Sequence, residues 1–123
     1  MPLPLSTSIL LVDDDASVRR SLGRLLRAHD YEVLEAGNVA QALVILATTP
    51  PALMLMDMLM PGDYSLDAVR KLKAEPRTAG IPIIALTGTP PSTPEDKALF
   101  AEIVAKPSDA RALLDTIARV LRG

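Results

Sequence analysis

The fold of this chain is decided by Ile9-Leu10-Leu11-Val12-Asp13-Asp14-Asp15, in which a short apolar run typical of a buried strand ends in acidic residues. A second apolar run, residues 53–56, ends in the same way at Asp57. In a parallel α/β sheet the carboxyl ends of all strands lie along one edge, and folds of this class bind their ligands there. We therefore expect Asp13, Asp14 and Asp57 to lie close together in the folded protein.

Converging carboxylates indicate a site for a cation. Carboxylates that are crowded together repel one another and raise each other's pKa unless a positive charge compensates them. A ligand set made only of oxygen atoms suits magnesium or calcium rather than zinc. The sequence therefore predicts that a divalent metal ion binds beside Asp57.

Two more apolar runs end in polar side chains, since Thr87 follows residues 83–86 and Lys106 follows residues 103–105. Transfer of a phosphoryl group needs an attacking oxygen, neutralisation of charge and donors for the phosphoryl oxygens. A carboxylate, a divalent cation, a hydroxyl group and an ammonium group supply these functions. The predicted chemistry is phosphorylation of Asp57.

Composition narrows the class of protein. The 123 residues are enough for one domain, and the net charge of −2 gives no basic field that would favour nucleic acid or an anionic membrane. The absence of cysteine excludes disulfides, thiol catalysis and thiolate metal sites. Each apolar run is interrupted well before the roughly 20 residues of a membrane helix, and the start lacks the basic region of a secretory signal. We expect a cytoplasmic protein whose partners are other proteins.

Alternation of short apolar runs with segments of helical period predicts five βα units around a parallel sheet. Asp15, Asn38 and Ser108 are expected to cap the first, second and last helices. The expected strands are residues 9–12, 31–34, 53–56, 81–86 and 103–105, and the expected buried helix positions are Val18, Leu22, Leu25, Leu26, Ala42, Leu43, Leu46, Leu66, Val69, Leu72, Leu113, Leu114, Ile117, Val120 and Leu121.

The region before the last strand is the exception to this regular pattern. Prolines at positions 90, 91 and 94 exclude a regular helix there, so we expect only a short fourth helix, residues 95–100. Residues 1–7 are expected to form an N-terminal tail, and residues 8–123 a single domain.

The motifs at the strand ends resemble the receiver domain of two-component response regulators, and the similarity extends over essentially the whole chain. They are residues 9–15, Asp57-Met58-Leu59-Met60-Pro61-Gly62, Leu86-Thr87-Gly88 and Lys106-Pro107. The resemblance implies a flavodoxin-like (βα)5 three-layer sandwich with the parallel strand order 2-1-3-4-5. It also implies that Asp57 is the phosphoacceptor, that Thr87 and Lys106 bind the phosphoryl group, and that Asp13, Asp14, Asp57 and the backbone carbonyl of Leu59 hold Mg²⁺.

The same resemblance implies what the domain does. It implies phosphoryl transfer from a sensor histidine kinase or a phosphotransfer protein, followed by a switch in the binding of a downstream protein. Such a domain catalyses only its own phosphotransfer and dephosphorylation. It is not expected to bind nucleic acid directly or to enter a membrane.

Four positions depart from the pattern of the family. Receivers commonly have Asp-Gly where this chain has Tyr64-Ser65, an aromatic residue where it has Ile103, and phenylalanine where it has Ser108. With the shortened fourth helix, these departures suggest an alternative, an atypical receiver that binds its partner largely without phosphorylation.

A remote alternative has a different nucleophile. The pattern Asp13-x-Asp15-x-Ser17 after an apolar strand is similar to the signature of haloacid-dehalogenase-like phosphatases, which would make Asp13 the attacking residue. The short chain and the absence of an acidic pair after the later strands argue against it.

Overall fold

The computed structural model describes residues 7–57, 64–88, 91, 93–105 and 109–122, and the expected tail lies almost wholly outside these residues. The described strands form one parallel sheet in the order β2-β1-β3-β4-β5. The elements in chain order are β1 (Ser8–Val12), α1 (Ala16–Ala28), β2 (Glu32–Ala36), α2 (Val39–Thr48), β3 (Leu53–Asp57), α3 (Tyr64–Ala74), β4 (Ile83–Thr87), α4 (Pro94–Lys97), β5 (Glu102–Ala105) and α5 (Ala110–Arg122). The flavodoxin-like order and the shortened α4 are confirmed.

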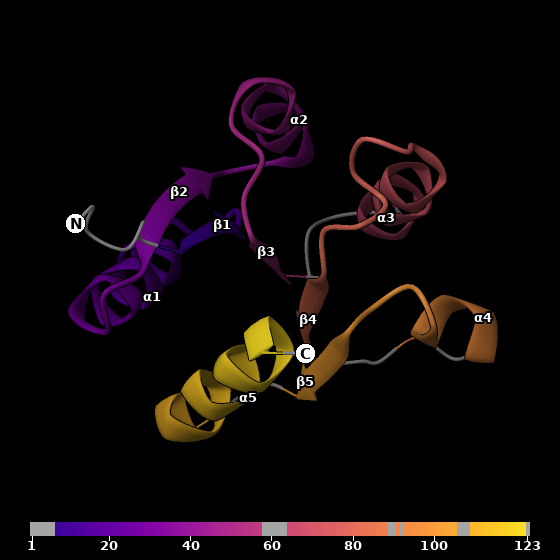
Figure 1. The fold of residues 1–123 in the computed structure, drawn as a ribbon. Helices are drawn as coiled ribbons and strands as arrows, with labels where there is room; N and C mark the ends of the chain where they lie inside the picture. The colour runs from indigo at the N-terminus through magenta and orange to yellow at the C-terminus, as the bar shows by residue number, and fades with distance from the viewer. Residues whose placement is uncertain (1–6, 58–63, 89–90, 92, 106–108, 123) are drawn as a thin grey trace.

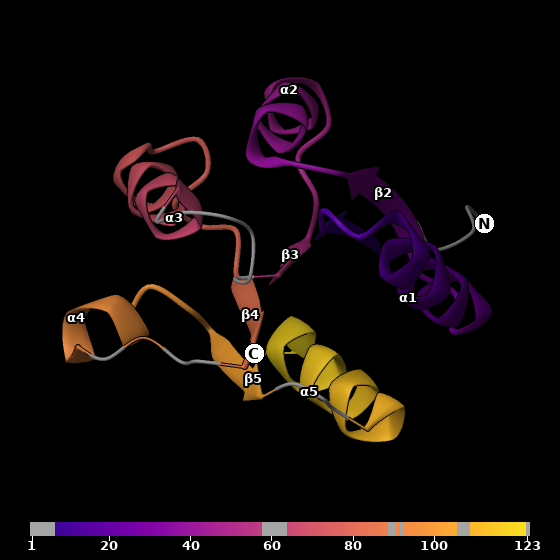
Figure 2. The ribbon, with the colours of Figure 1, turned by 180° about the vertical axis from the view of Figure 1, so that it is seen from behind.

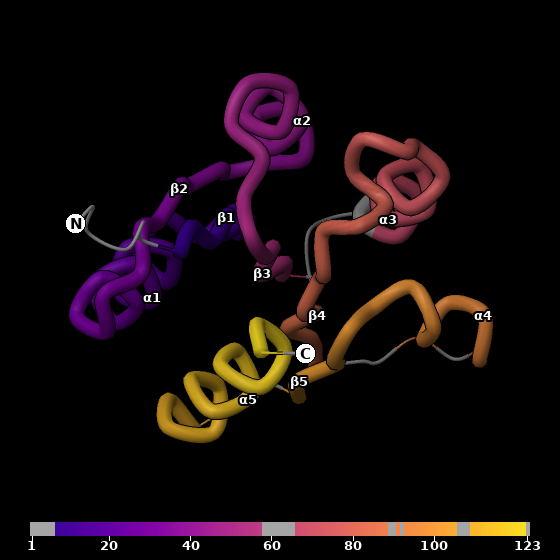
Figure 3. Tube along the Cα trace, viewed as in Figure 1, coloured from indigo at the N-terminus to yellow at the C-terminus, as the bar shows by residue number. Residues whose placement is uncertain are grey.

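Helices cover both faces of the sheet. Helices α1 and α5 lie on one face, and α2, α3 and α4 lie on the other, as the two opposite views show (Figures 1 and 2). The trace in Figure 3 shows the same arrangement, with the described helices on either side of the strands. None of the described helices is both long enough and apolar enough to span a lipid bilayer.

Each interior strand contributes side chains to both halves of the core, because successive side chains of a strand point to opposite faces. The α1/α5 face buries Ile9, Leu11, Leu53, Leu55, Ile84 and Leu86 against Leu26, Leu113 and Ile117. The α2/α3 face buries Leu10, Val12, Met54, Met56, Ile83 and Ala85 against Ala42, Leu46, Val69 and Leu72. Strands that are apolar on both sides are the signature of a parallel sheet covered twice, which is why the sequence shows continuous apolar runs there.

Polar side chains fix where the first two helices begin, as predicted. The carboxylate of Asp15 accepts hydrogen bonds from the backbone N–H groups of Ser17 (2.9 Å) and Val18 (3.2 Å) at the start of α1. Asn38 accepts one from Gln41 (2.8 Å) at the start of α2. These bonds satisfy backbone donors that have no partner within a helix.

The beginning of α5 is described only from residue 109 onward. Ser108, the expected cap, lies outside the described residues. The carboxylate of Asp109 accepts a hydrogen bond from the N–H of Arg111 (3.1 Å), and its carbonyl accepts one from Leu113 (3.0 Å). Asp109 therefore makes the bonds that are typical of a helix cap.

Helix α4 is even shorter than predicted. Thr93 caps it, Pro94 is its first residue, and it ends at Lys97, three residues before the expected end. Three residues after the end of the helix, the side chain of Phe100 lies in the core, where it is 8% exposed. A proline at the first position is compatible with a helix start, since its missing N–H would have no partner in any case.

Helix α2 contains one wrong prediction. Ala42 and Leu46 are buried as expected, but Leu43 is 49% exposed; on α1, the expected buried position Val18 is likewise wrong, with 39% exposed. Every residue of α2 is uncharged and most are apolar, so hydrophobicity marks no single face of this helix. The sequence pattern therefore could not tell which leucine points to the sheet.

Candidate functional site

The three acids that the sequence singles out lie together at the carboxyl edge of the sheet. Val12 is paired with Met56 across β1 and β3, so Asp13 and Asp57 leave two adjacent strands at the same level. One carboxylate oxygen from each of Asp13, Asp14 and Asp57 lies within 4.8 Å of the others. The parallel arrangement of the two central strands is what brings these residues together.

Burial divides this acidic cluster into an inner and an outer part. Asp13 is 1% exposed and Asp57 is 4% exposed, whereas Asp14 is open to solvent. Carboxylate oxygens gathered in this way attract a cation, whose charge offsets their mutual repulsion. Oxygen donors at this separation fit a hard divalent cation such as Mg²⁺ or Ca²⁺, so the arrangement agrees with the metal site that the sequence predicts.

Hydrogen bonds hold Asp13 in place. Its backbone N–H donates to the carbonyl of Ala36 on β2 (3.1 Å), and its side chain accepts from the N–H of Asp15 (2.9 Å). The guanidinium of Arg19 donates through Nη1 to the Asp13 carbonyl (2.7 Å). The backbone and the carboxylate of Asp13 are thus both oriented by residues outside the cluster.

Arg19 is the residue of this region that the sequence analysis missed. Its Nε donates to Oε1 of Glu35 on β2 (3.3 Å), and Nη2 of Arg27 donates to the other oxygen of the same glutamate (3.1 Å). A Cβ atom at Gly37 would lie 3.2 Å from Nη1 of Arg19, so the small residue leaves room for the guanidinium. The ion pairs join α1 to β2 across 16 and 8 residues of sequence, and no local pattern signals such a contact.

Thr87 is the fourth described residue of the predicted site. It is the last residue of β4 and is 1% exposed. Leu86 is paired with Asp57, so Thr87 lies one position further toward the same edge of the sheet. Its hydroxyl group therefore belongs to the strand next to the one that carries Asp57.

Other predicted features fall partly or wholly outside the described residues. Leu59, the expected fourth source of a metal ligand, and Lys106, the expected ammonium group, are both among the residues that the structure does not describe. Tyr64 and Ser65 form the start of α3, so Ser65 has a helical backbone and no glycine-like conformation is required of it. The departure at Ser65 is thus accommodated by the helix.

Ile103 occupies the position at which receivers commonly carry an aromatic residue. It is half-buried, packs against the core on the α2/α3 face, and is paired with Ala85 of β4. Ala85 is in turn paired with Met56, the residue before Asp57. Met56, Ala85 and Ile103 thus form a row across β3, β4 and β5. The aliphatic, β-branched side chain of Ile103 is the last in this row, at the edge of the sheet.

Comparison with known proteins gives one consistent result. The family model described as the response regulator receiver domain matches residues 9–118. The phosphate regulon transcriptional regulatory protein PhoB of Pseudomonas aeruginosa is 34% identical over 118 residues, which cover 94% of this chain and 52% of PhoB. Protein PilH of the same organism is 32% identical over 118 residues, which cover 94% of this chain and 98% of PilH.

The solved structures agree with the sequence relatives. The chemotaxis protein CheY4 of Vibrio cholerae superposes with a TM-score of 0.82 at 26% identity, covering 94% of this chain and 99% of CheY4. The chain thus spans about half the length of PhoB but nearly the whole of PilH and CheY4.

Proposed function

The chain belongs to the response regulator receiver domain family and has the phosphoacceptor function of two-component signalling, and we propose that Asp57 is the residue that accepts the phosphoryl group. The observation that carries this assignment is the position of the Asp57 carboxylate. Asp57 is the last residue of an interior strand and is almost completely buried. One of its carboxylate oxygens lies within 4.8 Å of oxygens of Asp13 and Asp14. Buried, mutually repelling acids beside a hydroxyl group are the arrangement that metal-assisted phosphoryl transfer requires.

The proposed reaction is a direct displacement at phosphorus. A carboxylate oxygen of Asp57 attacks the phosphorus of a phosphohistidine, and the P–N bond breaks as the new P–O bond forms. The histidine nitrogen leaves with the bonding electron pair and takes up a proton, so the products are an acyl phosphate and a neutral histidine. The donor histidine belongs to another protein, a sensor histidine kinase or a phosphotransfer protein.

The remaining site residues have supporting roles in this proposal. Asp13, Asp14, Asp57 and the backbone carbonyl of Leu59 would hold Mg²⁺, which supplies the positive charge that offsets the acids and the phosphoryl oxygens. The hydroxyl of Thr87 donates a hydrogen bond to a phosphoryl oxygen, and the ammonium of Lys106 pairs with another. Asp15 acts as the cap of α1 and keeps the Asp13 carboxylate oriented through its N–H group.

Receiver domains are signalling modules rather than conventional enzymes, and we propose that this domain catalyses only its own phosphorylation and dephosphorylation. Phosphorylation changes the relative stability of two surface states, and a downstream protein binds one of them better. We place the protein in the cytoplasm, without direct contact to nucleic acid or membrane through these residues.

The test is uptake of beryllofluoride, a phosphoryl mimic, in the presence of Mg²⁺. Fluorine NMR should show a bound beryllofluoride signal for the wild-type protein and none for Asp57→Asn. Asp67→Asn is the matched control, because Asp67 is an exposed acid on α3 that pairs with Arg70 outside the acidic cluster. An unchanged signal in Asp57→Asn would show that another residue accepts the group.

The atypical, phosphorylation-independent receiver remains the second candidate, because Ile103 and the four-residue α4 depart from the family pattern. Its distinguishing result is a partner affinity that does not change when beryllofluoride is added. Membership in the receiver family, with a match over residues 9–118, argues against the haloacid-dehalogenase-like alternative.

A further inference from the structure

The outer surface of α2 is unusual for a helix that faces solvent. The large hydrophobic side chains that are exposed among the described residues are Val18 (39%), Leu43 (49%) and Val44 (68%), and the last two are neighbours on α2. None of the ten residues of α2 carries a charge. Solvent-facing sides of helices normally carry charged or polar residues, so an uncharged, apolar surface indicates a contact with another molecule.

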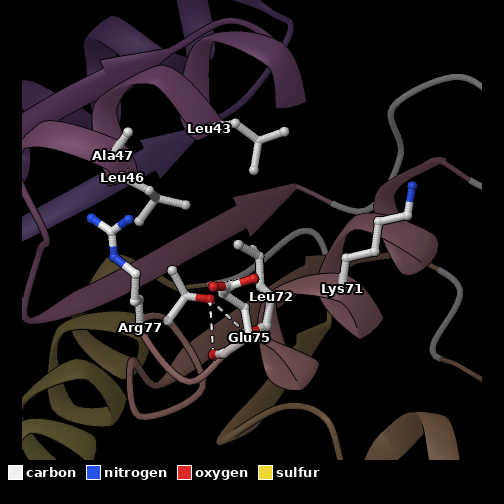
Figure 4. Close-up of a pocket in the computed structure, with 8 residues that line it drawn as sticks. Leu43, Leu46, Ala47, Lys71, Leu72, Glu75 and Arg77 are labelled. Carbon is white, nitrogen blue, oxygen red and sulfur yellow. Dashed lines mark hydrogen bonds between the residues drawn. The ribbon is translucent and has the colours of Figure 1, made fainter.

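This surface borders a groove between α2 and α3. The groove has a volume of about 350 Å³ and is lined by Leu43, Leu46, Ala47, Lys71, Leu72, Glu75, Arg77 and Thr78. In Figure 4, Leu43, Leu46 and Ala47 project from α2, while Leu72 comes from the facing helix α3 and Glu75 from the residue that follows its end. The lining is thus apolar on the α2 side, and its charged side chains come from α3 and the residues that follow it.

The exposed apolar positions of α2 are arranged symmetrically along the helix, whereas the exposed polar residues Gln41 and Thr48 lie to one side of them. Ala40, Leu43, Val44 and Ala47 are all exposed, and their spacing of three, one and three residues places them on one face. The sizes of these four side chains follow the order small, large, large, small in either direction along the helix. If two such helices pack antiparallel, Leu43 of one copy lies opposite Val44 of the other, and Ala40 lies opposite Ala47.

We propose that the α2 surface, defined as Ala40, Leu43, Val44 and Ala47 with the adjoining groove, is a self-association site at which a second copy of this chain packs its α2 antiparallel. A contact around a two-fold axis uses the same surface on both copies, so the surface must be complementary to itself. The symmetric order of side-chain sizes in α2 meets this requirement. The contact is independent of the phosphorylation chemistry proposed above.

The charges around the surface favour a second copy over a strongly charged partner. Because α2 carries no charge, two copies of it meet without repulsion between like charges. Among the residues lining the groove, Lys71 and Arg77 are positive and Glu75 is negative, so a second copy would bring charges of both signs to this surface rather than a field of one sign. The helix has only ten residues, so the contact is small and belongs to the class of weak, transient interfaces.

Sedimentation velocity at micromolar to millimolar protein concentration tests the association. We expect the wild-type mass to rise with concentration toward that of a dimer. Val44→Glu should weaken the association at least about tenfold, because a carboxylate would be buried against apolar side chains of the other copy. Val18→Glu is the matched control, since Val18 is the exposed large hydrophobic residue on α1, and it should associate like the wild type.

Cysteine pairs test the antiparallel arrangement, and the chain suits this experiment because it contains no cysteine. A disulfide forms only when the two Cα atoms are within about 7 Å. A mixture of Ala40→Cys and Ala47→Cys proteins should give a disulfide-linked heterodimer, whereas Ala40→Cys alone should not link to itself. Circular dichroism and beryllofluoride uptake of each variant should match the wild type, because none of these residues belongs to the acidic site.

Three results would overturn the proposal. The first is a wild-type protein that stays monomeric at every concentration, which would leave the surface to a different partner. The second is association that Val44→Glu does not weaken, which would place the contact elsewhere on the molecule. The third is self-linking of Ala40→Cys, which would show a parallel rather than an antiparallel pairing of α2.

Discussion

Strands β3 and β5 both pair with β4, one on each side of it, but their side chains have different surroundings. All five residues of β3 are buried, including Asp57. In β5, Glu102, Ile103 and Val104 are half-buried and Ala105 is exposed. The strands therefore form the same kind of ladder, and what differs is the amount of core on either side of them.

This difference separates the chemistry of the domain from its surface. The acidic cluster lies on β1 and β3, which are interior strands held by neighbours on both sides. Strand β5 is an edge strand, and α4 beside it in sequence has only four residues. Segments with few buried contacts rearrange at low free-energy cost. We expect the acidic site to keep its geometry on phosphorylation, while the β5 edge changes its structure.

The largest expected effect is on the free energy of unfolding, when one side chain of β3 and one of β5 are shortened in separate variants. Met56, Ala85 and Ile103 are paired across β3, β4 and β5 and lie on the same face of the sheet. Met56→Ala should lower the free energy of unfolding by about 2–5 kcal/mol, because Met56 is fully enclosed and its loss leaves a cavity. Ile103→Ala should cost only roughly 1 kcal/mol, since the half-buried site keeps water nearby.

Urea denaturation of both variants without metal provides the measurement. The m-value should stay constant, which would show that the same surface is exposed on unfolding. Equal losses of stability in the two variants would mean that β5 is as firmly packed as β3, and the distinction between interior and edge would not hold.

The next effect is on the binding of Mg²⁺ at the acidic cluster. Arg19→Gln removes the hydrogen bond to the Asp13 carbonyl and the ion pair with Glu35. Loss of a residue that orients a metal ligand typically weakens metal binding, and we expect the dissociation constant for Mg²⁺ to rise roughly tenfold. Calorimetric titration with Mg²⁺ measures it.

The matched control for this prediction is Arg27→Gln. Arg27 pairs with the same glutamate but, unlike Arg19, does not donate to the Asp13 carbonyl in the described part of the chain, so its removal changes the local charge without releasing Asp13, the proposed ligand. Charge alone predicts tighter Mg²⁺ binding for both variants, because a positive charge is lost near a cation site. Weaker binding in Arg19→Gln only would identify a positioning role, and tighter binding in both would refute it.

Much of the interior could be predicted from the sequence, because the interior strands are continuous apolar runs and the parallel sheet rule places their ends together. The observed first and last residues of two strands differ from the predicted ones for local reasons. Strand β2 was expected at residues 31–34 and is observed at Glu32–Ala36, because a charged residue, Glu35, lies inside it and is neutralised by the arginines of α1. Strand β4 begins after Pro82, which lacks the N–H group that a ladder needs.

The parts that could not be predicted depend on contacts between distant residues. Arg19 differs from Arg27, which pairs with the same Glu35, because the Asp13 carbonyl is also within its reach. The exposure of Leu43 depends on which side of an entirely uncharged helix meets the sheet. The order of the strands was expected from the resemblance to receivers, since the periodicity of a sequence does not specify which strands are neighbours.

A smaller effect is expected from restoring an aromatic residue at the edge. Ile103→Tyr should change the free energy of unfolding by less than about 1 kcal/mol, because the site is half-buried and the ring can extend toward solvent. Isoleucine is restricted in χ1, whereas tyrosine can occupy an inward or an outward position. Beryllofluoride should therefore shift the amide resonances of β5 more in Ile103→Tyr than in the wild type. Equal shifts in the two proteins would show that residue 103 does not influence the response.

The smallest effect lies between α3 and α4, where Arg70 bonds to Asp67 (2.9 Å) and to Asp96 (2.9 Å). The hydrogen bond from Arg70 lowers the pKa of the Asp96 carboxyl below its ordinary value of 3.8. A lowered pKa in the folded state means that the contribution to stability is complete above the pKa of the unfolded chain and is lost as the pH falls through the lowered value. The Arg70 side chain is half-exposed, so water screens the pair and the contribution itself is small.

NMR titration of the Asp96 carboxyl carbon measures this contact directly. Arg70→Gln should return the pKa of Asp96 toward its ordinary value, because the charged hydrogen-bond donor is removed. Lys71→Gln, on the next residue of the same helix, should leave the titration unchanged, since no ion pair joins Lys71 to Asp96 in the described part of the chain. If Asp96 titrates at the same pH in all three proteins, then α4 is not linked to α3 through Arg70. The β5 edge would in that case be even less firmly attached than its burial indicates.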